Sequence, residues 1–190
     1  MNKGVGWSSA ERQQHRFRIF AGLFADECSD RLVINDLGCG YGAMFEAYAD
    51  LPQLERGRYF GYDISREMLA QANSRIRDKR ASFILSHEAT RDADYSFVSG
   101  SYNIKMHAGD REWLEFVLDN LTQLWSRTHT GLAFNMMSIH TPEKHRTLYY
   151  ADPRIFLAFC RRVLSPDSRL FDGYDDREWT IFVRRQGGSP

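Results

Sequence analysis

One stretch near the start of the chain constrains the fold more than any other. Residues 32–37 form a short apolar run, three alternating glycines follow at Gly38, Gly40 and Gly42, and apolar residues then recur at helical spacing. The apolar run suits a parallel strand that is buried on both faces. Glycines allow a turn that a ligand can approach closely. We therefore expect a strand, a ligand-binding turn and a helix start, at the carboxyl end of a strand in an open α/β sheet.

The glycine turn is compatible with two kinds of nucleotide. Residues 38–43 fit the dinucleotide fingerprint, whose last position accepts alanine. Asp36, however, would oppose a pyrophosphate and would favour a cationic ligand, such as the amino group or sulfonium of S-adenosylmethionine (SAM). A chain of 190 residues also leaves little room for the substrate domain of a dehydrogenase. We favour SAM and keep two alternatives, a nicotinamide-dependent Rossmann oxidoreductase and a non-catalytic nucleotide-binding module.

Two motifs resemble those of the class I SAM-dependent methyltransferases. Asp36-Leu37-Gly38-Cys39-Gly40-Tyr41-Gly42 resembles the first motif of that family, and residues 60–65 followed by Glu67-Met68-Leu69 resemble the second. The resemblance implies a cofactor site of SAM, with S-adenosylhomocysteine (SAH) as its product. In the first motif its members would be Asp36, Gly38, Cys39, Gly40 and Gly42. In the second, Asp63 would bind the ribose hydroxyls, and Ile64 and Met68 would cover the adenine.

Asp63 also supports this interpretation by its position. It follows Gly38 by about the interval expected between a glycine turn and a ribose-binding acid in a βαβ unit. The alternative role for Asp63 is to cap the next helix, but Ser65 is better placed to do so.

The resemblance also implies the fold. It predicts an α/β, Rossmann-like three-layer sandwich with a mostly parallel seven-stranded sheet of order 3-2-1-4-5-7-6, whose last strand is antiparallel. Residues 169–174 and 179–184 alternate between apolar and polar around an acidic turn, which is typical of the closing antiparallel pair.

Further cofactor residues are expected after the third and fourth strands. Glu88 and Ala89 follow the expected strand 81–85, where many family members carry an acid followed by an alanine, and the acid or its neighbouring amide reads the adenine amino group. Ser99 follows the expected strand 93–98, at the position where the family places its fourth motif between methyl donor and acceptor. This chain lacks the Asn-Pro-Pro-Tyr of nucleobase and glutamine methyltransferases, and its Ser-Gly-x-x-Asn resembles small-molecule enzymes.

Candidate catalytic residues lie beyond these strands. Tyr102 and Asn103 are expected to shape the acceptor site, although Asn103 is equally suited to hydrogen-bonding a loop. His107 and His140 follow the fourth and fifth strands and are candidate bases for a hydroxyl acceptor. The alternative for each histidine is a structural or exposed position.

Substrate-binding residues are predicted by position alone. Asn135 lies near the end of the expected strand 130–138, and Tyr149 and Tyr150 follow a polar loop that would act as a lid. The tyrosines are suited to stacking on a substrate, and buried structural tyrosines are the equal alternative.

Two helices are predicted in more detail. Ser8 and Glu11 have capping-box spacing ahead of an apolar stripe, and Arg12, His15, Arg16 and Arg18 are expected to form a solvated face of that helix. A later helix is expected to be capped by Asp110.

Composition limits the remaining possibilities. The length suits one domain, residues 1–190, with a helical segment at 1–28 and a flexible end at 187–190. The chain has 25 basic and 25 acidic residues, so it lacks the net positive charge that is typical of proteins that bind free nucleic acid. Cys28, Cys39 and Cys160 are read as reduced thiols of a cytoplasmic protein. We expect no membrane span and no metal site, and a small-molecule or carbohydrate partner. The acceptor atom and the oligomeric state stay open.

Overall fold

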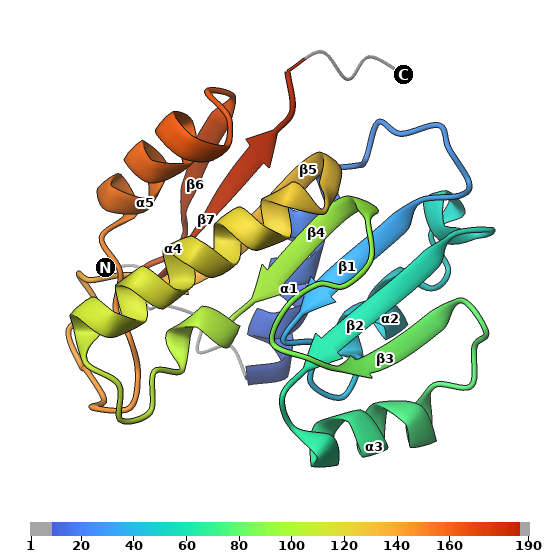
Figure 1. Ribbon diagram of the computed structural model, residues 1–190, viewed down its shortest axis with the longest axis horizontal. Helices are drawn as coiled ribbons and strands as arrows, with labels where there is room; N and C mark the ends of the chain where they lie inside the picture. Colours follow the sequence, from blue (N-terminus) through green and yellow to red (C-terminus); the bar gives the residue numbers. More distant parts are fainter. Residues whose placement is uncertain (1–8, 187–190) are drawn as a thin grey trace, which may run out of the picture.

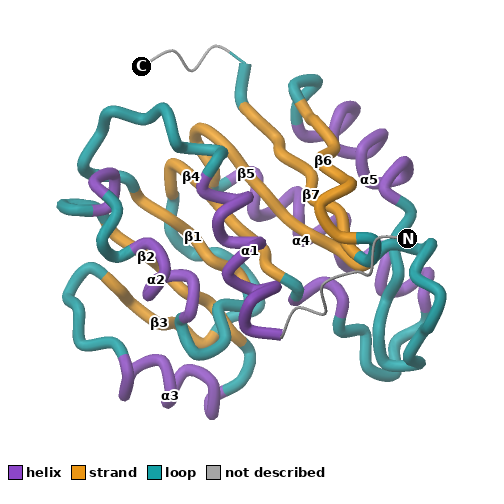
Figure 2. Tube along the Cα trace, turned by 180° about the vertical axis from the view of Figure 1, so that it is seen from behind, coloured by secondary structure: helices purple, strands orange, loops and turns teal. Residues whose placement is uncertain are grey.

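The computed structural model describes residues 9–186 and has one sheet between two layers of helices (Figure 1, Figure 2). Ser8 of the expected capping box and the expected flexible end at 187–190 lie outside the described residues. The helices are α1 (Ser9–Ala21), α2 (Ala43–Tyr48), α3 (Arg66–Arg75), α4 (Asp110–Ser126) and α5 (Pro153–Phe159), with short helical turns η1 (Pro52–Leu54), η2 (Ser101–Asn103) and η3 (Cys160–Leu164). The strands are β1 (Val33–Leu37), β2 (Arg58–Asp63), β3 (Ala81–Leu85), β4 (Ala93–Ser99), β5 (Thr128–Met137), β6 (Ser168–Asp175) and β7 (Glu178–Arg184).

The seven strands are arranged in the order β3-β2-β1-β4-β5-β7-β6. β1 to β5 pair in parallel, whereas β7 runs antiparallel to both β5 and β6. The predicted fold class and strand order are confirmed. Because β7 runs against its neighbours, it begins at the edge where β4 and β5 end (Figure 1).

Apolar side chains cover both faces of the sheet. On one face Phe17 and Phe20 of α1 pack with Tyr48 of α2 and with Phe97 of β4. On the other face lie α4 and α5, and the fully buried Leu121 of α4 belongs to that core (Figure 1). The helical spacing that predicted these stripes therefore marks the sides that bury apolar area.

Strand β1, which lies between β2 and β4, carries two buried polar side chains. Asn35 and Asp36 are 0% and 2% exposed, and successive residues of a strand point to opposite faces. Tyr62 donates a hydrogen bond to Asn35 at 3.2 Å, and Tyr59 donates one to Asp36. Two tyrosines of β2 thus give each of these buried side chains a hydrogen-bond donor.

Three local expectations differ from the structure. The N-cap of α4 is Gly109, and Asp110 is the first helical residue, where its exposed carboxylate pairs with Lys105. β5 begins at Thr128, two residues earlier than expected, and ends at Met137, one residue before the expected end at Ser138.

Among residues 9–186, no helix combines the length and apolar character needed to cross a bilayer.

Candidate functional site

The glycine turn after β1 leaves one stretch of backbone open. Gly38, Gly40 and Gly42 all have positive φ, at 77°, 55° and 86°. A Cβ at Gly38 would lie 1.7 Å from Ser101 Oγ, and one at Gly42 would lie 2.4 Å from Ile76 Cδ1. A Cβ at Gly40 would meet nothing within 4 Å. A side chain at Gly38 or Gly42 would therefore collide with neighbouring side chains, whereas the space that a side chain at Gly40 would occupy is open.

Asp63 joins the glycine turn to the end of β2. Its Oδ2 accepts a hydrogen bond from the Gly40 amide at 2.8 Å, and its Oδ1 accepts one from the Ser65 amide at 2.8 Å. Ser65 caps α3, because its hydroxyl accepts from the Met68 amide at 3.2 Å. The capping role is thus filled by Ser65, and each Asp63 oxygen keeps lone pairs for another donor.

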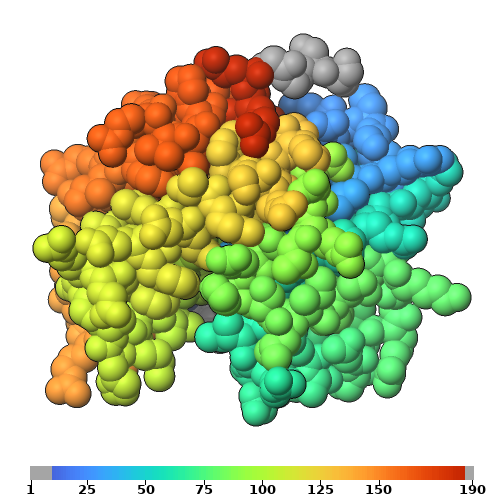
Figure 3. Space-filling view, in the orientation of Figure 1, coloured from blue at the N-terminus to red at the C-terminus, as the bar shows by residue number. Residues whose placement is uncertain are grey.

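A crevice of about 310 Å³ opens beside this turn, between the residues that follow β2 and β3 and the start of α4 (Figure 3). Gly38, Asp63, Ser86, His87 and Ser101 contribute to its lining. The remaining wall is largely apolar and includes Leu37, Ile64, Ile104, Met106, Trp113 and Phe116. A polar end beside an apolar slot suits a ligand that combines a hydroxylated part with a flat apolar ring.

The second motif places its two apolar residues differently. Ile64 is 77% exposed and lines the crevice, as expected of a residue that covers a ring. Met68 is 39% exposed and does not line it. Cys39 is buried, and its sulfur lies where a Cβ at Gly61 would come within 2.8 Å. The Cys39 side chain therefore packs against Gly61 of β2, and this burial raises the pKa of its thiol.

Asp36 lies behind the glycine turn and does not line the crevice. Burial raises its pKa to about 7, against the hydrogen bond from Tyr59, which lowers it. Among the described residues, its Oδ1 has no hydrogen-bond partner. A buried carboxylate with an unsatisfied oxygen favours nearby positive charge. Asp36 can therefore favour the cationic ligand predicted from the sequence through its charge, but its buried side chain does not line the crevice.

The residues after β3 that line the crevice differ from those expected. Ser86 and His87 line it, whereas Glu88 and Ala89 do not. Ala89 is 1% exposed and belongs to the core, and the half-exposed Glu88 pairs with His87, with Nε2 and Oε1 3.5 Å apart. The loop between β3 and β4 has no periodicity that would fix this offset from the sequence.

Tyr102 and Asn103 are tied into the fold. The Tyr102 hydroxyl donates to Asn120 Oδ1 at 2.8 Å, and burial raises its pKa above the usual range. Asn103 is buried, and its Oδ1 accepts from the Met137 amide at 2.8 Å. Tyr102 still lines the crevice. The Asn103 side chain instead hydrogen-bonds a loop, which was the alternative role expected for it.

The two histidines are separated from the crevice. His107 and His140 are both exposed, and neither lines it. The structure gives neither imidazole a hydrogen bond to any residue between 9 and 186. Their geometry matches the exposed alternative rather than that of a positioned base.

The loop that contains Tyr149 and Tyr150 is pinned to the loop after β4. Tyr149 is 9% exposed, and its amide donates to the Asn103 carbonyl at 2.8 Å. The Tyr150 hydroxyl accepts from the His145 amide at 3.0 Å, and Lys144 lies over its ring. Tyr149 therefore joins the two loops, and Tyr150 makes structural contacts within its own loop.

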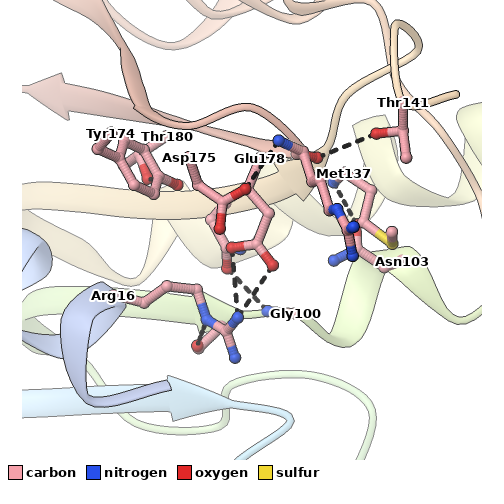
Figure 4. Close-up of polar contacts among 12 residues, drawn as sticks. Arg16, Gly100, Asn103, Met137, Thr141, Tyr174, Asp175, Glu178 and Thr180 are labelled. Atoms are coloured by element: carbon pink, nitrogen blue, oxygen red, sulfur yellow. Dashed lines mark hydrogen bonds and ion pairs between the residues drawn. The ribbon is translucent and has the colours of Figure 1, made fainter. Parts of the chain in front are cut away.

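A buried polar network lies at the edge where β4 and β5 end (Figure 4). Arg16 donates from Nη1 to both Glu178 oxygens at 3.0 and 3.2 Å and from Nε to Ser99 Oγ at 3.3 Å. Asn135 donates to Glu178 Oε2 at 3.1 Å and accepts from the Gly100 amide at 2.9 Å. Asn135 is fully buried, so its polar atoms serve the network.

This network corrects one expectation and adds one residue. Arg16 does not belong to a solvated face, because its side chain is 15% exposed and ion-paired. Glu178 was not predicted from the sequence, although an antiparallel last strand must begin at this edge. Burial raises the pKa of Glu178, while Arg16 and the nearby Arg12 lower it and Asp175 raises it.

Comparisons with known proteins agree with this geometry. A family described as "Methyltransferase domain" matches residues 34–127. Rv1506c of Mycobacterium tuberculosis, whose name places it among the methyltransferases, is 35% identical over 160 residues, which cover 83% of this chain and 95% of that protein.

Solved structures share the fold at low identity. Magnesium protoporphyrin IX methyltransferase from Synechocystis PCC 6803 with bound SAH has a TM-score of 0.68 at 14% identity, covering 96% of this chain and 90% of that one. The plantazolicin methyltransferase BpumL with SAH has a TM-score of 0.65 at 14% identity, covering 92% and 84%. These likenesses establish the architecture around the glycine turn.

Proposed function

Because the chain belongs to the class I SAM-dependent methyltransferases, we propose that it moves the methyl group of SAM to a small molecule or a sugar. The observation that supports this best is that Gly38 and Asp63 line one end of a crevice whose remaining wall is largely apolar. Asp63 also accepts from the amide of Gly40, beside which there is open space. The family assignment removes the nicotinamide-dependent oxidoreductase from consideration. Balanced charge and the single sheet support a small acceptor over a nucleic acid.

The cofactor role of the crevice follows from its residue types. Asp63 would accept hydrogen bonds from ribose hydroxyls with the lone pairs that Gly40 and Ser65 leave free. Ile64 and Trp113 offer apolar surface for the adenine. Asp36 contributes negative charge behind the turn, and its raised pKa falls as positive charge approaches.

The reaction places few chemical demands on the protein. When bound, SAM supplies a methyl group on a positively charged sulfonium. The side chains of this protein bind, orient and exclude water, because alignment and desolvation are the main contributions to such a transfer. No imidazole among the described residues lines the crevice as a base other than the exposed His87.

The proposal includes the organisation and location of the chain. We treat residues 1–190 as one domain, which the single sheet and its two helical layers support. A cytoplasmic location is supported by the three cysteines, Cys28, Cys39 and Cys160, all of which are free thiols.

Calorimetric titration with SAH, alongside NADH, tests the cofactor. We expect saturable binding of SAH and none of NADH, and binding of NADH alone would contradict the proposal. A second experiment incubates the protein with methyl-labelled SAM and separate pools of sugars, nucleotide sugars, small hydroxylated or amino compounds, protein and RNA. Label in a small-molecule pool supports the acceptor class, whereas label only in protein or RNA overturns it. Tight SAH binding without any labelled product would favour the non-catalytic module.

A further inference from the structure

The Arg16–Glu178 pair occupies a functional edge of the sheet. Glu178 is the first residue of β7 and lies opposite Met137 at the end of β5. Ser99, which Arg16 contacts, is the last residue of β4. The pair therefore spans α1, β4 and β7 at the edge where open α/β sheets bind their ligands (Figure 4).

The pair is poorly explained as a stabilising contact alone. Both side chains are largely buried, at 15% and 14% exposed, so each charge has lost most of its water. The desolvation penalty of a buried ion pair can exceed its Coulombic gain, which makes such a pair weak evidence for stability. Its geometry is specific instead, because Arg16 uses two different nitrogens to hold residues from two strands.

A continuous set of contacts leads from this pair to the cofactor turn. Glu178 accepts from Asn135, and Asn135 in turn accepts from the Gly100 amide. Gly100 has a φ of 81° and introduces η2, whose first residue is Ser101. The Ser101 hydroxyl lies against Gly38 and donates to its carbonyl at 3.3 Å. The position of residues 99–101 is thus held from one side by the pair and from the other by the glycine turn.

We propose that Arg16 and Glu178 are a positioning pair for methyl transfer, which holds residues 99–101 against the glycine turn so that bound SAM keeps one orientation. The inference rests on the proposed function and assigns roles that neither residue was predicted to have. Both act through residues 99–101 and are not themselves placed in contact with the reacting atoms.

Two variants separate this role from folding. Glu178→Gln keeps the size but offers one acceptor oxygen where the carboxylate offers two. Arg16 therefore loses one of its two acceptors, and Asn135 loses its acceptor when the new NH2 group replaces Oε2. Arg16→Lys keeps the positive charge but cannot bind Ser99 and Glu178 from two fixed nitrogens. The charged neighbours Arg12 and Asp175 are unchanged in both variants.

A matched control lies at the opposite edge of the sheet. Asp78 and Arg80 form a half-buried pair at 2.6 Å, with side chains 33% and 22% exposed, just before β3 begins. Asp78→Asn therefore removes a carboxylate from an ion pair that, among the described residues, neither lines the crevice nor hydrogen-bonds to residues 99–101. This variant shows whether loss of an ion pair elsewhere in the protein also changes the methyl resonance of bound SAM or the hydrogen exchange of the Gly100 amide.

The test uses [methyl-¹³C]SAM bound to the full chain, with the methyl resonance recorded by NMR. We expect Glu178→Gln and Arg16→Lys to shift this resonance from its wild-type position and to speed hydrogen exchange of the Gly100 amide. Asp78→Asn should leave both unchanged, and SAM affinity should fall by less than about tenfold in each variant.

Each other outcome is decisive. An unchanged methyl resonance in the variants overturns the positioning role. A shifted resonance with unchanged Gly100 exchange also overturns it, because the pair would then act by charge alone. Failure of the wild-type protein to bind SAM would instead reject the proposed function. If Glu178→Gln does not fold, Arg16→Lys provides the same two measurements.

Discussion

Asp63 is the residue whose loss should affect cofactor affinity most directly. Asp63→Ala removes an acceptor for ribose hydroxyls and also frees the Gly40 amide, so we expect SAH binding to weaken by about 1–3 kcal/mol. Calorimetric titration measures the change. Ser65→Ala is the control, because it removes the α3 cap and costs about 0.5–2 kcal/mol of stability while leaving Asp63 in place. Equal SAH affinities for Asp63→Ala and wild type would show that the ribose binds elsewhere.

Asp36 should make stability depend on pH. Its pKa is raised from 3.8 to about 7, so the folded state holds a proton that the unfolded chain releases above pH 4. This group therefore lowers the free energy of unfolding as pH rises from about 4 to about 7, by an amount of the order of a few kcal/mol. Asp36→Asn removes the effect. The difference in the free energy of unfolding, variant minus wild type, should therefore be more favourable to the variant at pH 8 than at pH 5. Urea unfolding at both pH values measures it, and a pH-independent difference would contradict the assignment.

At the scale of elements, the loops after β4 and β5 support one another. The Asn103 side chain holds the Met137 amide, while its carbonyl accepts from Tyr149 in the next loop. Asn103→Ala leaves the partly buried Met137 amide without its acceptor, and we expect a loss of about 1–3 kcal/mol in the free energy of unfolding, measured in urea. SAH affinity should be unchanged. Unchanged stability combined with lost methyl transfer would restore the catalytic role predicted from the sequence.

The element scale also explains which predictions succeeded. The structure of residues 32–42 is predictable from the sequence, because an apolar run indicates a buried strand and alternating glycines permit the positive φ angles of the turn. Arg16 was misassigned because helical spacing identifies the apolar face of α1 but not the strand edge that its polar side meets. Glu178 joins the site only through antiparallel pairing of β7 with β5, which is a contact between distant parts of the chain.

For the whole molecule, ligand binding and folding are linked through the glycine turn. A ligand that binds only the folded state stabilises it by about 2.7 kcal/mol at 100 times its Kd. For a chain of this size we expect SAH at that concentration to raise the Tm by about 5–10 °C. Gly40→Val should abolish this increase, because its side chain would fill the open space beside the turn.

Gly173→Val is the control that separates blocked binding from backbone strain. Gly173 also has positive φ, 79°, and open space around its missing Cβ, but it lies in β6 away from the crevice. Valine at either position adopts an unfavourable left-handed conformation, so both variants should lose about 1–3 kcal/mol without ligand. Thermal unfolding with and without SAH should then show the ligand-induced increase in Gly173→Val and its absence in Gly40→Val. An equal increase in both variants would place the ligand away from the open backbone of Gly40.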